Sequence, residues 1–272
     1  MMIVCAGDCG VDHYLPSGRL LAGGITANFA RHALQEFAHD DELHLLTAIG
    51  DEPDAAGIVR RAFTNTRIRC HIAELPGHTP VQFIEVQADG ERKFVRYDAG
   101  VLASYRLDDA ARALIGAADL VVTPMFQQVR ELFESIISVP LQGKMAVDFA
   151  DFAQHPDMAH LESCLDRIDV AFFGLSRRDT RVIAELSSLA ERWHKLFVVT
   201  LGPHGSEAFH GHAHYRQDAI PVSKVVDTTG AGDAFAAAFL ACWMKCNDVA
   251  ASLARGATLA ARVVQGLGAM TP

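Results

Sequence analysis

Residues 225–235, with the sequence VVDTTGAGDAF, lead directly into the apolar run AAAFLACW. This pattern predicts a strand that ends, a turn of three small residues and a helix that begins at about Gly232. The start of a helix offers unpaired backbone N–H groups and the positive end of the helix dipole. Because Gly230, Ala231 and Gly232 carry almost no side chain, an anion could approach these amides closely. The stretch therefore predicts a site for an anionic group.

Asp233 falls in the first turn of the predicted helix, beside this anion site. A carboxylate at that place has two interpretations. It stabilises the helix end through the dipole, which is worth roughly 0.3 to 1 kcal/mol, or it accepts the proton of a hydroxyl that attacks a phosphorus atom held by the same amides. Taken alone, the residue favours the structural interpretation, and the neighbouring motifs described below shift the balance to the catalytic one.

Two common nucleotide-binding motifs are missing around this stretch. The chain contains no GxxxxGK[ST], so the lysine and hydroxyl of a P-loop are absent. The pair Gly230 and Gly232 lacks the third glycine of a dinucleotide fingerprint and lies far from the first strand. A nicotinamide cofactor is therefore not expected.

The rest of the chain alternates short β-branched runs with longer amphipathic runs, which is typical of an α/β fold with a mostly parallel sheet between helices. Strands are predicted at residues 2–6, 44–48, 120–123, 145–149, 170–173 and 196–200. Helices are predicted at residues 27–37, 53–65, 106–117, 130–138, 179–193, 232–245 and 249–265.

Two stretches depart from this alternation and predict hairpins. Residues 79–86 and 92–97 flank the turn-forming run from Ala88 to Gly90, so we expect an antiparallel hairpin that could act as a lid. Residues 208–214 and 215–222 predict a second hairpin. In it, His210, His212 and His214 would share one face of a strand; a polar outer face is favoured there over a metal site.

Composition sets further limits. Of 272 residues, 50% are hydrophobic and 21% charged, which excludes intrinsic disorder. The net charge of −9 argues against a nucleic-acid partner. The longest apolar run, at residues 234–244, is about half of a membrane-spanning helix, and no signal peptide is recognisable, so a cytoplasmic location is expected. Six scattered cysteines indicate reduced, mostly buried thiols, and for Cys242 and Cys246 core packing is favoured over a zinc site.

The run DTTGAGDAF resembles the C-terminal signature of the PfkB, or ribokinase-like, family of carbohydrate kinases. Residues 23–30, GGITANFA, resemble the glycine-rich N-terminal motif of that family, and residues 198–206, VVTLGPHGS, resemble its nucleotide-site strand and turn. The three motifs occur in the family's order over essentially the whole chain. The resemblance implies one domain over residues 1–272, a three-layer sandwich with a central mostly parallel sheet, and a small β-lid formed by about residues 12–20 and 76–100.

The resemblance also implies roles at the phosphoryl-transfer site. Asp233 would remove the proton of the attacking hydroxyl, and the amides of Gly230, Ala231 and Gly232 would form an anion hole for the transferred phosphate. ATP would be the phosphoryl donor, and Mg²⁺ would accompany it.

On the sugar side, Asp12 matches the family's acidic residue at the end of the first strand that hydrogen-bonds sugar hydroxyls, although it could equally be an exposed turn residue. Gly23 and Gly24 would let the backbone approach the sugar, and Asn28 would supply an amide contact, although Asn28 could equally cap a helix.

On the nucleotide side, Thr200, Gly202 and Gly205 would line the ATP site, with Thr258 and Ala261 near the adenine.

The metal ligands are less well matched. The family's NxxE motif, which organises Mg²⁺, is replaced by the residues 174–177, GLSR. Asp148 and Asp151 at the end of another strand could help to hold the ion. Asp227 and Thr229 match positions that often bind a monovalent cation, so potassium activation is a further expectation.

Within the family, the segments GDCGVDHYLP and RKFVRYDAG most resemble bacterial fructoselysine 6-kinases. Arg92, Arg96 and Tyr97 could then contact the amino-acid part of a glycated amine, or they could be ordinary hairpin residues. The phosphorylated group would be a primary hydroxyl of a sugar or sugar-amine. The alternatives are a ribokinase, fructokinase or nucleoside kinase, or a catalytically weak sensor that binds sugar and nucleotide. Because lids in this family often pair into dimers, the resemblance also implies a homodimer through the lid.

Overall fold

The centre of the molecule is a large sheet, and the computed structural model describes residues 1–272 except 16, 88–89, 151, 155 and 271–272. In the described residues, nine strands form this sheet in the order β13-β12-β11-β10-β9-β8-β1-β4-β5. All neighbouring strands are parallel except at one edge, where β12 and β13 are antiparallel. The strands are β1 Met2–Ala6, β4 Glu42–Gly50, β5 Arg69–Leu75, β8 Leu120–Pro124, β9 Lys144–Asp148, β10 Val170–Gly174, β11 Leu196–Thr200, β12 Ser206–His210 and β13 Ala213–Gln217.

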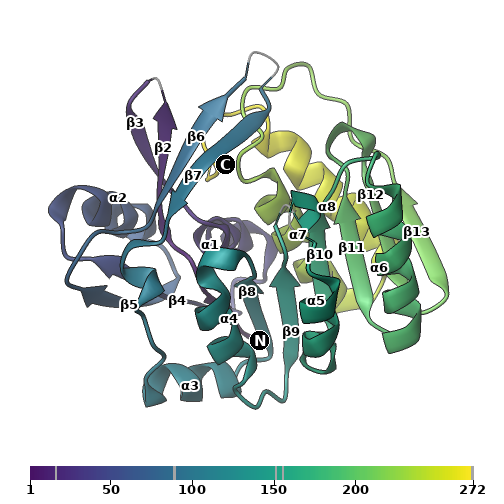
Figure 1. Ribbon diagram of the computed structural model, residues 1–272, viewed down its shortest axis with the longest axis horizontal. Helices are drawn as coiled ribbons and strands as arrows, with labels where there is room; N and C mark the ends of the chain where they lie inside the picture. Colours follow the sequence, from purple (N-terminus) through teal and green to yellow (C-terminus); the bar gives the residue numbers. More distant parts are fainter. Residues whose placement is uncertain (16, 88–89, 151, 155, 271–272) are drawn as a thin grey trace.

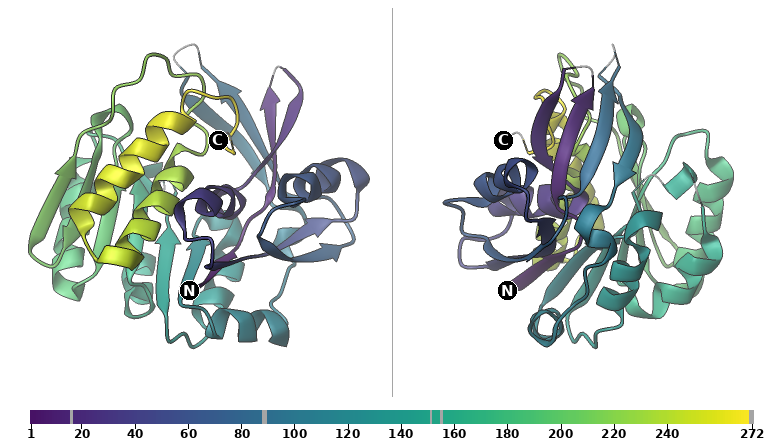
Figure 2. Two further views of the ribbon diagram at one scale, coloured as in Figure 1. Left: turned by 180° about the vertical axis from the view of Figure 1, so that it is seen from behind. Right: turned by 60° about the vertical axis from the view of Figure 1, so that its left-hand side comes forward.

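Helices cover both faces of this sheet, as Figures 1 and 2 show. Because the central strands are apolar on both sides, their side chains pack into two separate hydrophobic clusters, one under each helical layer. One layer contains α3 Asp109–Gly116, α4 Arg130–Ile137, α5 Met158–Cys164 and α6 Thr180–Trp193, and the other contains α1 Ile25–Glu36, α2 Pro53–Phe63, α7 Ala231–Cys246 and α8 Val249–Val263. The predicted three-layer α/β fold is confirmed.

A second sheet of four strands projects beyond the large one (Figure 1). Its order is β3-β2-β6-β7, and only the β2–β6 pair is parallel. The strands are β2 Gly10–Leu15, β3 Arg19–Gly23, β6 Val81–Val86 and β7 Arg92–Asp98. This sheet, called the lid sheet below, contains both segments predicted for the lid. The hairpin β6–β7 is antiparallel as predicted, and Ala88 and Asp89 of its predicted turn lie outside the described residues.

The second predicted hairpin exists, but the predicted position of its turn is wrong. The chain reverses at Gly211, whose φ of 56° favours glycine, so His210 and His214 lie on opposite strands and His212 lies in the turn. His214 contacts Glu207 at 2.8 Å and His212 contacts Glu191 at 3.0 Å. The part of the chain that the structure describes has no group of three or more histidine, cysteine or acidic side chains placed to hold a metal ion.

Two smaller predictions are also wrong. Residues 225–227 form no strand, because the amides of Val226 and Asp227 donate to the carbonyl of Val264 at the end of α8 rather than to a sheet. Cys246 is exposed and Cys242 is half-buried, so neither thiol is packed in the core as predicted. None of the helices described has the length and apolarity that crossing a bilayer requires.

Candidate active site

The start of α7 forms a corner beneath the lid sheet. Gly230 caps the helix with a φ of 79°, and a Cβ there would lie 2.6 Å from the Cα of Ala269, so only glycine fits. A Cβ on Gly232 would meet nothing within 4 Å, because this residue borders a large cleft. The amide of Ala231 donates to the carbonyl of Thr228 at 3.2 Å. An incoming anion would therefore compete with this bond for one of the three predicted amides.

Asp233 lies in the first turn of α7 and borders the same cleft, with only 8% of its surface exposed. Its Oδ2 accepts a hydrogen bond of 2.7 Å from the amide Nδ2 of Asn28. Burial raises the pKa of Asp233 well above its usual range; the charges of Asp148 and Asp8 raise it further, whereas the Asn28 bond and the charge of Arg92 lower it. A carboxyl whose pKa is shifted toward neutrality is suited to accept a proton.

Asn28 does not cap a helix. Its amide N–H donates to the carbonyl of Gly24 at 2.8 Å, which places it inside α1, and the cap is Gly24 with a φ of 105°. The capping interpretation is therefore wrong, and the Asn28 side chain instead orients the Asp233 carboxylate.

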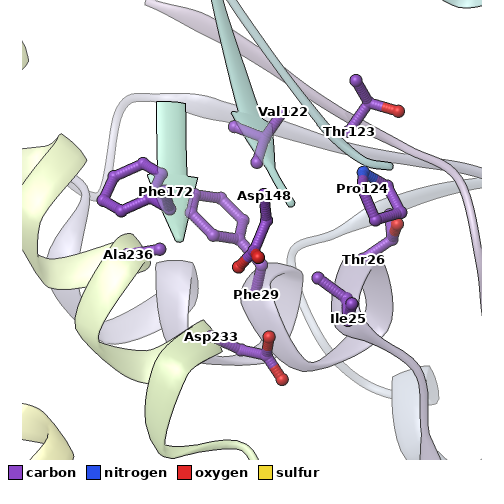
Figure 3. A pocket seen from close by; sticks show the side chains of 10 residues that line it. All are labelled: Ile25, Thr26, Phe29, Val122, Thr123, Pro124, Asp148, Phe172, Asp233 and Ala236. Carbon is purple, nitrogen blue, oxygen red and sulfur yellow. The ribbon is translucent and has the colours of Figure 1, made fainter. Parts of the chain in front are cut away.

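Asp148, at the end of β9, lies across a small cavity from Asp233 (Figure 3). The cavity has a volume of about 10 Å³, close to what one water molecule needs. Thr123, Phe29 and Phe172 form part of its wall. Two carboxyl groups facing one cavity repel each other when both are ionised, which is why Asp148 contributes to the raised pKa of Asp233.

The prediction from sequence missed Asp8, a buried residue that follows β1. Its carboxylate accepts bonds from the amides of Ile25 and Thr26, both at 3.0 Å, and from the Thr26 hydroxyl at 3.1 Å. Asp8 thereby holds the first turn of α1, the helix that carries Asn28. A carboxylate that caps a helix 17 residues later in the chain leaves no local sequence signal.

Asp12 lies in β2 of the lid sheet and not at the end of the first strand, and it is 3% exposed. Burial, with the charges of Asp8 and Asp227, raises the pKa of Asp12 to about 8. Its Oδ2 is buried and has no hydrogen-bond partner. A Cβ on Gly23 would lie 2.4 Å from the Asp12 carboxyl atoms, so Gly23 makes room for this side chain. An unpaired buried oxygen at a cleft is suited to a ligand hydroxyl.

The lid strand β7 supplies three predicted residues to the cleft, Arg92, Arg96 and Tyr97. The Arg92 guanidinium donates to the carbonyl of Thr228 at 3.3 Å, which connects the lid sheet to the loop before the anion site. The Arg96 guanidinium lies 4.2 Å from the ring centre of Phe83. The hydroxyl of Tyr97 is buried without a partner.

The cleft between the lid sheet and the large sheet has a volume of about 1530 Å³. Small-ligand pockets usually have about 300 to 1000 Å³, so the cleft has room for two substrates. Thr200, Gly202, Gly205 and Ala261, the residues that the resemblance assigns to the ATP side, line the same cleft. The predicted residues that line the cleft are Asp12, Gly24, Asn28, Arg92, Arg96, Tyr97, Thr200, Gly202, Gly205, Thr229, Gly230, Ala231, Gly232, Asp233 and Ala261.

Three predicted residues do not line the cleft. Gly23 lies behind Asp12, and the hydroxyl of Thr258 donates to the carbonyl of Ala254 within α8. Asp227 is completely buried beneath the cleft.

Among the residues that the structure describes, no group of three or more acidic, histidine or cysteine side chains is placed to hold a divalent cation in the cleft. At the site of the missing NxxE motif, the amide and hydroxyl of Ser176 donate to Asp179 at 2.7 and 2.8 Å, so this carboxylate is already used. Asp148 borders the cleft, whereas Asp151 lies outside the described residues. Mg²⁺ usually takes one or two carboxylates together with substrate phosphates and water, and Asp148 fits that requirement.

Comparison with known proteins gave one family and several relatives. Residues 2–272 match the sequence profile of a family described as "pfkB family carbohydrate kinase". The chain is 26% identical over 263 residues to the fructoselysine 6-kinase of Escherichia coli K12, covering 97% of each chain. It is 24% identical over 273 residues to the fructosamine kinase FrlD of Bacillus subtilis, covering 99% of this chain and 93% of that one.

Among solved structures, the fold is similar to that of the adenosine kinase from Sinorhizobium meliloti, with a TM-score of 0.83. The identity is 18%, and the match covers 98% of this chain and 94% of the other. A likeness at this level supports the architecture of the two sheets and their helices.

Proposed function

Because the chain belongs to the pfkB family of carbohydrate kinases, which transfer a phosphoryl group from ATP to an alcohol, we propose that it phosphorylates a primary hydroxyl of a sugar or sugar-amine. The observation that carries this proposal is the position of Asp233. This buried carboxyl lies at the start of a helix and borders the cleft that the lid residues and the predicted nucleotide-side residues also line.

In the proposed reaction, Asp233 removes the proton of the substrate hydroxyl as that oxygen attacks the γ-phosphorus of ATP. The bond from Asn28 keeps one carboxylate oxygen fixed and leaves the other to face the hydroxyl. The backbone around Gly230 and Gly232 stabilises charge on the transferred phosphoryl group. Mg²⁺ bound with ATP would neutralise phosphate charge, and Asp148, which borders the cleft, would be its ligand from the protein. Asp12 holds the sugar through its unpaired oxygen.

We propose that the substrate is a glycated amine, a sugar attached to an amino acid. The two curated relatives described above are named for fructoselysine and fructosamine. In this chain, Arg92 and Arg96 place two positive charges along the lid side of the cleft. A guanidinium pairs well with a carboxylate, so these residues are suited to the carboxylate of an amino-acid part.

The experiment is an assay that couples ADP release to a spectroscopic signal, run over glycated amines, ketoses, ribose and nucleosides. We expect turnover with a glycated amine to exceed turnover with the free sugars. A preference for ribose, fructose or a nucleoside would contradict the substrate proposal but not the kinase. No turnover with any candidate would favour a sensor that only binds sugar and nucleotide.

The role of Asp233 is tested by the substitution Asp233→Asn. Loss of a general base typically costs 10² to 10⁴ in rate, so we expect kcat to fall by about 10³ while ATP still binds. Asp166→Asn is the matched control, because Asp166 is an exposed acid with a side chain 63% exposed. Near-normal turnover by Asp233→Asn would show that another group accepts the proton.

A further inference from the structure

Asp227 is a buried carboxylate with a full set of hydrogen-bond donors. Its Oδ1 accepts from the amide and the hydroxyl of Thr229, at 2.9 and 2.6 Å. Its Oδ2 accepts from the hydroxyl of Tyr14 at 2.8 Å and from the amide of Gly268 at 2.9 Å. A carboxylate has about four lone-pair sites, and all four are used here.

These donors come from parts of the chain that are far apart. Tyr14 belongs to β2 of the lid sheet, 213 residues before Asp227, and is 4% exposed. Thr229 directly precedes Gly230, the glycine that caps α7. Gly268 precedes Ala269, the residue against which Gly230 packs. Asp227 therefore joins the lid sheet, the anion-site loop and the last part of the described chain.

The donor set does not fit a monovalent cation at the Asp227 side chain, contrary to the expectation drawn from the family. A cation needs oxygen lone pairs, whereas the described groups that hydrogen-bond to this carboxylate are N–H and O–H donors. To ligate an ion, Asp227 would have to give up one or more of these bonds at a site with no exposed surface.

We propose that Tyr14 is a positioning residue that takes the place of a monovalent cation. Through Asp227, its hydroxyl fixes residues 227–230 in the geometry that presents the anion site. The inference rests on the proposed kinase function for its effect on turnover. The inference adds that the enzyme works without potassium. The hydroxyl of Tyr14 stabilises the buried Asp227 carboxylate by donating a hydrogen bond to it.

Removing the hydroxyl leaves one lone pair of Asp227 without a donor and frees the loop beside Gly230. Tyr14 lies beneath the cleft and is absent from its lining, so its loss should act on the phosphoryl group rather than on the sugar. A loss confined to the phosphoryl group distinguishes positioning from a general effect on folding, because misfolding would weaken sugar binding and turnover together.

The test uses Tyr14→Phe, with Tyr105→Phe as the control. Tyr105 is another buried tyrosine, 7% exposed, outside the cleft lining. We expect Tyr14→Phe to lower kcat about tenfold while the KM for the sugar stays within about threefold, and Tyr105→Phe to change neither. We expect wild-type turnover to change by less than about twofold when potassium chloride replaces tetramethylammonium chloride at equal ionic strength.

Two results would overturn the proposal. Unchanged kcat in Tyr14→Phe would show that the hydroxyl does not position the loop. Activation of the wild type by potassium of more than about tenfold would show that a cation is needed after all.

A binding experiment keeps the inference testable if no sugar is turned over, which would be a failure of the proposed function instead. Calorimetric titration would measure the affinities of the wild type and of Tyr14→Phe for ATP and for adenosine. We expect Tyr14→Phe to bind ATP about tenfold more weakly and adenosine unchanged, since only ATP carries the phosphates that the loop holds. Equal ATP affinity in the two proteins would contradict positioning independently of any substrate.

Discussion

Asp12 is an acid that the fold holds largely in its neutral form at neutral pH. Its pKa of about 8 lies far above the usual carboxyl value of 3.8. Between these two values the folded protein keeps a proton that the unfolded chain releases. The free energy of unfolding therefore falls as the pH rises from about 4 to about 8. The buried, unpaired oxygen of Asp12 thus reduces the stability of the free protein, and the same oxygen is available to bond a sugar hydroxyl.

The substitution Asp12→Asn should expose this cost. Since asparagine does not ionise, the free energy of unfolding of the variant should not show the decline with rising pH that Asp12 causes in the wild type. We expect the variant to gain more than about 1 kcal/mol relative to wild type between pH 5 and pH 8. Thermal melting without ligand at both values measures the difference. A constant difference across the range would show that Asp12 titrates normally.

The pH dependence of turnover should depend on the Asp148–Asp233 pair. A base must be deprotonated, so activity should rise with pH through the raised pKa of Asp233. Removing the charge of Asp148 lowers that pKa, so Asp148→Asn should move the acid limb of the kcat/KM profile to lower pH by about one unit. Asp166→Asn should leave the limb in place. A limb unaffected by Asp148→Asn would show that this charge does not reach Asp233.

Among single residues of the site, those that belong to contiguous motifs could be predicted from the sequence. Asp233, Gly230 and Gly232 share one run of letters, and the physical argument from a helix start led to them without reference to fold. Asp8 and Tyr14 act through partners 17 and 213 residues away, which only the folded chain brings together.

The start of α1 depends on a group outside the helix. Gly24 has no side chain with which to cap it, and Asp8 provides the acceptor for two of its first amides. By contrast, α3 is capped locally, by Asp108 accepting from the amide of Ala111 at 2.7 Å.

These two caps should differ in their effect on stability. Asp108→Ala should cost about 1 kcal/mol of unfolding free energy, the usual value for a local cap. Asp8→Ala removes three hydrogen bonds, two of them buried and one partly buried, and should cost about 2 to 4 kcal/mol. It should also lower kcat, because α1 carries Asn28. Chemical denaturation of both variants gives the comparison, and equal losses would contradict the stronger role of Asp8.

The elements that sequence predicted well are the apolar ones. The strands β1, β8 and β10 are buried on both faces, and their boundaries agree with the prediction within one residue. The edge strand β5, with the sequence RCHIAEL, was missed because its exposed polar side chains break any apolar run. The helix α5 was missed because it has only 7 residues.

At the scale of the whole molecule, the main feature is the cleft, which residues of both sheets line. Lid residues on one side and residues of the large sheet on the other would both contact a pair of bound substrates. Such an arrangement should close on its ligands and exclude water.

Hydrogen exchange should detect this closure. With a sugar and a non-hydrolysable ATP analogue present, we expect slower exchange in β6 and β7, and unchanged exchange in β13, which forms the far edge of the large sheet and does not line the cleft. Protection spread equally over both sheets would indicate general stabilisation, and no protection in β7 would argue against closure.

The homodimer through the lid stays a prediction. Sedimentation of the free protein distinguishes one chain from two. The strands β6 and β7 could be found in the sequence because they alternate, whereas the segment of β2 and β3 was assigned to the lid only by the family resemblance. The pairing of β2 with β6, more than 60 residues away, is set only when the chain folds.

The contact between Gly230 and Ala269 also has a consequence for biosynthesis. The ribosome makes Asp227 before the residue whose amide completes its hydrogen bonds, because Gly268 follows 41 residues later. While the last residues are still inside the exit tunnel, Asp227 lacks the hydrogen bond from the amide of Gly268. Phosphorylation should therefore begin only after translation has passed the final helix, and a fragment that stops at α8 should be inactive even when its sheets have formed.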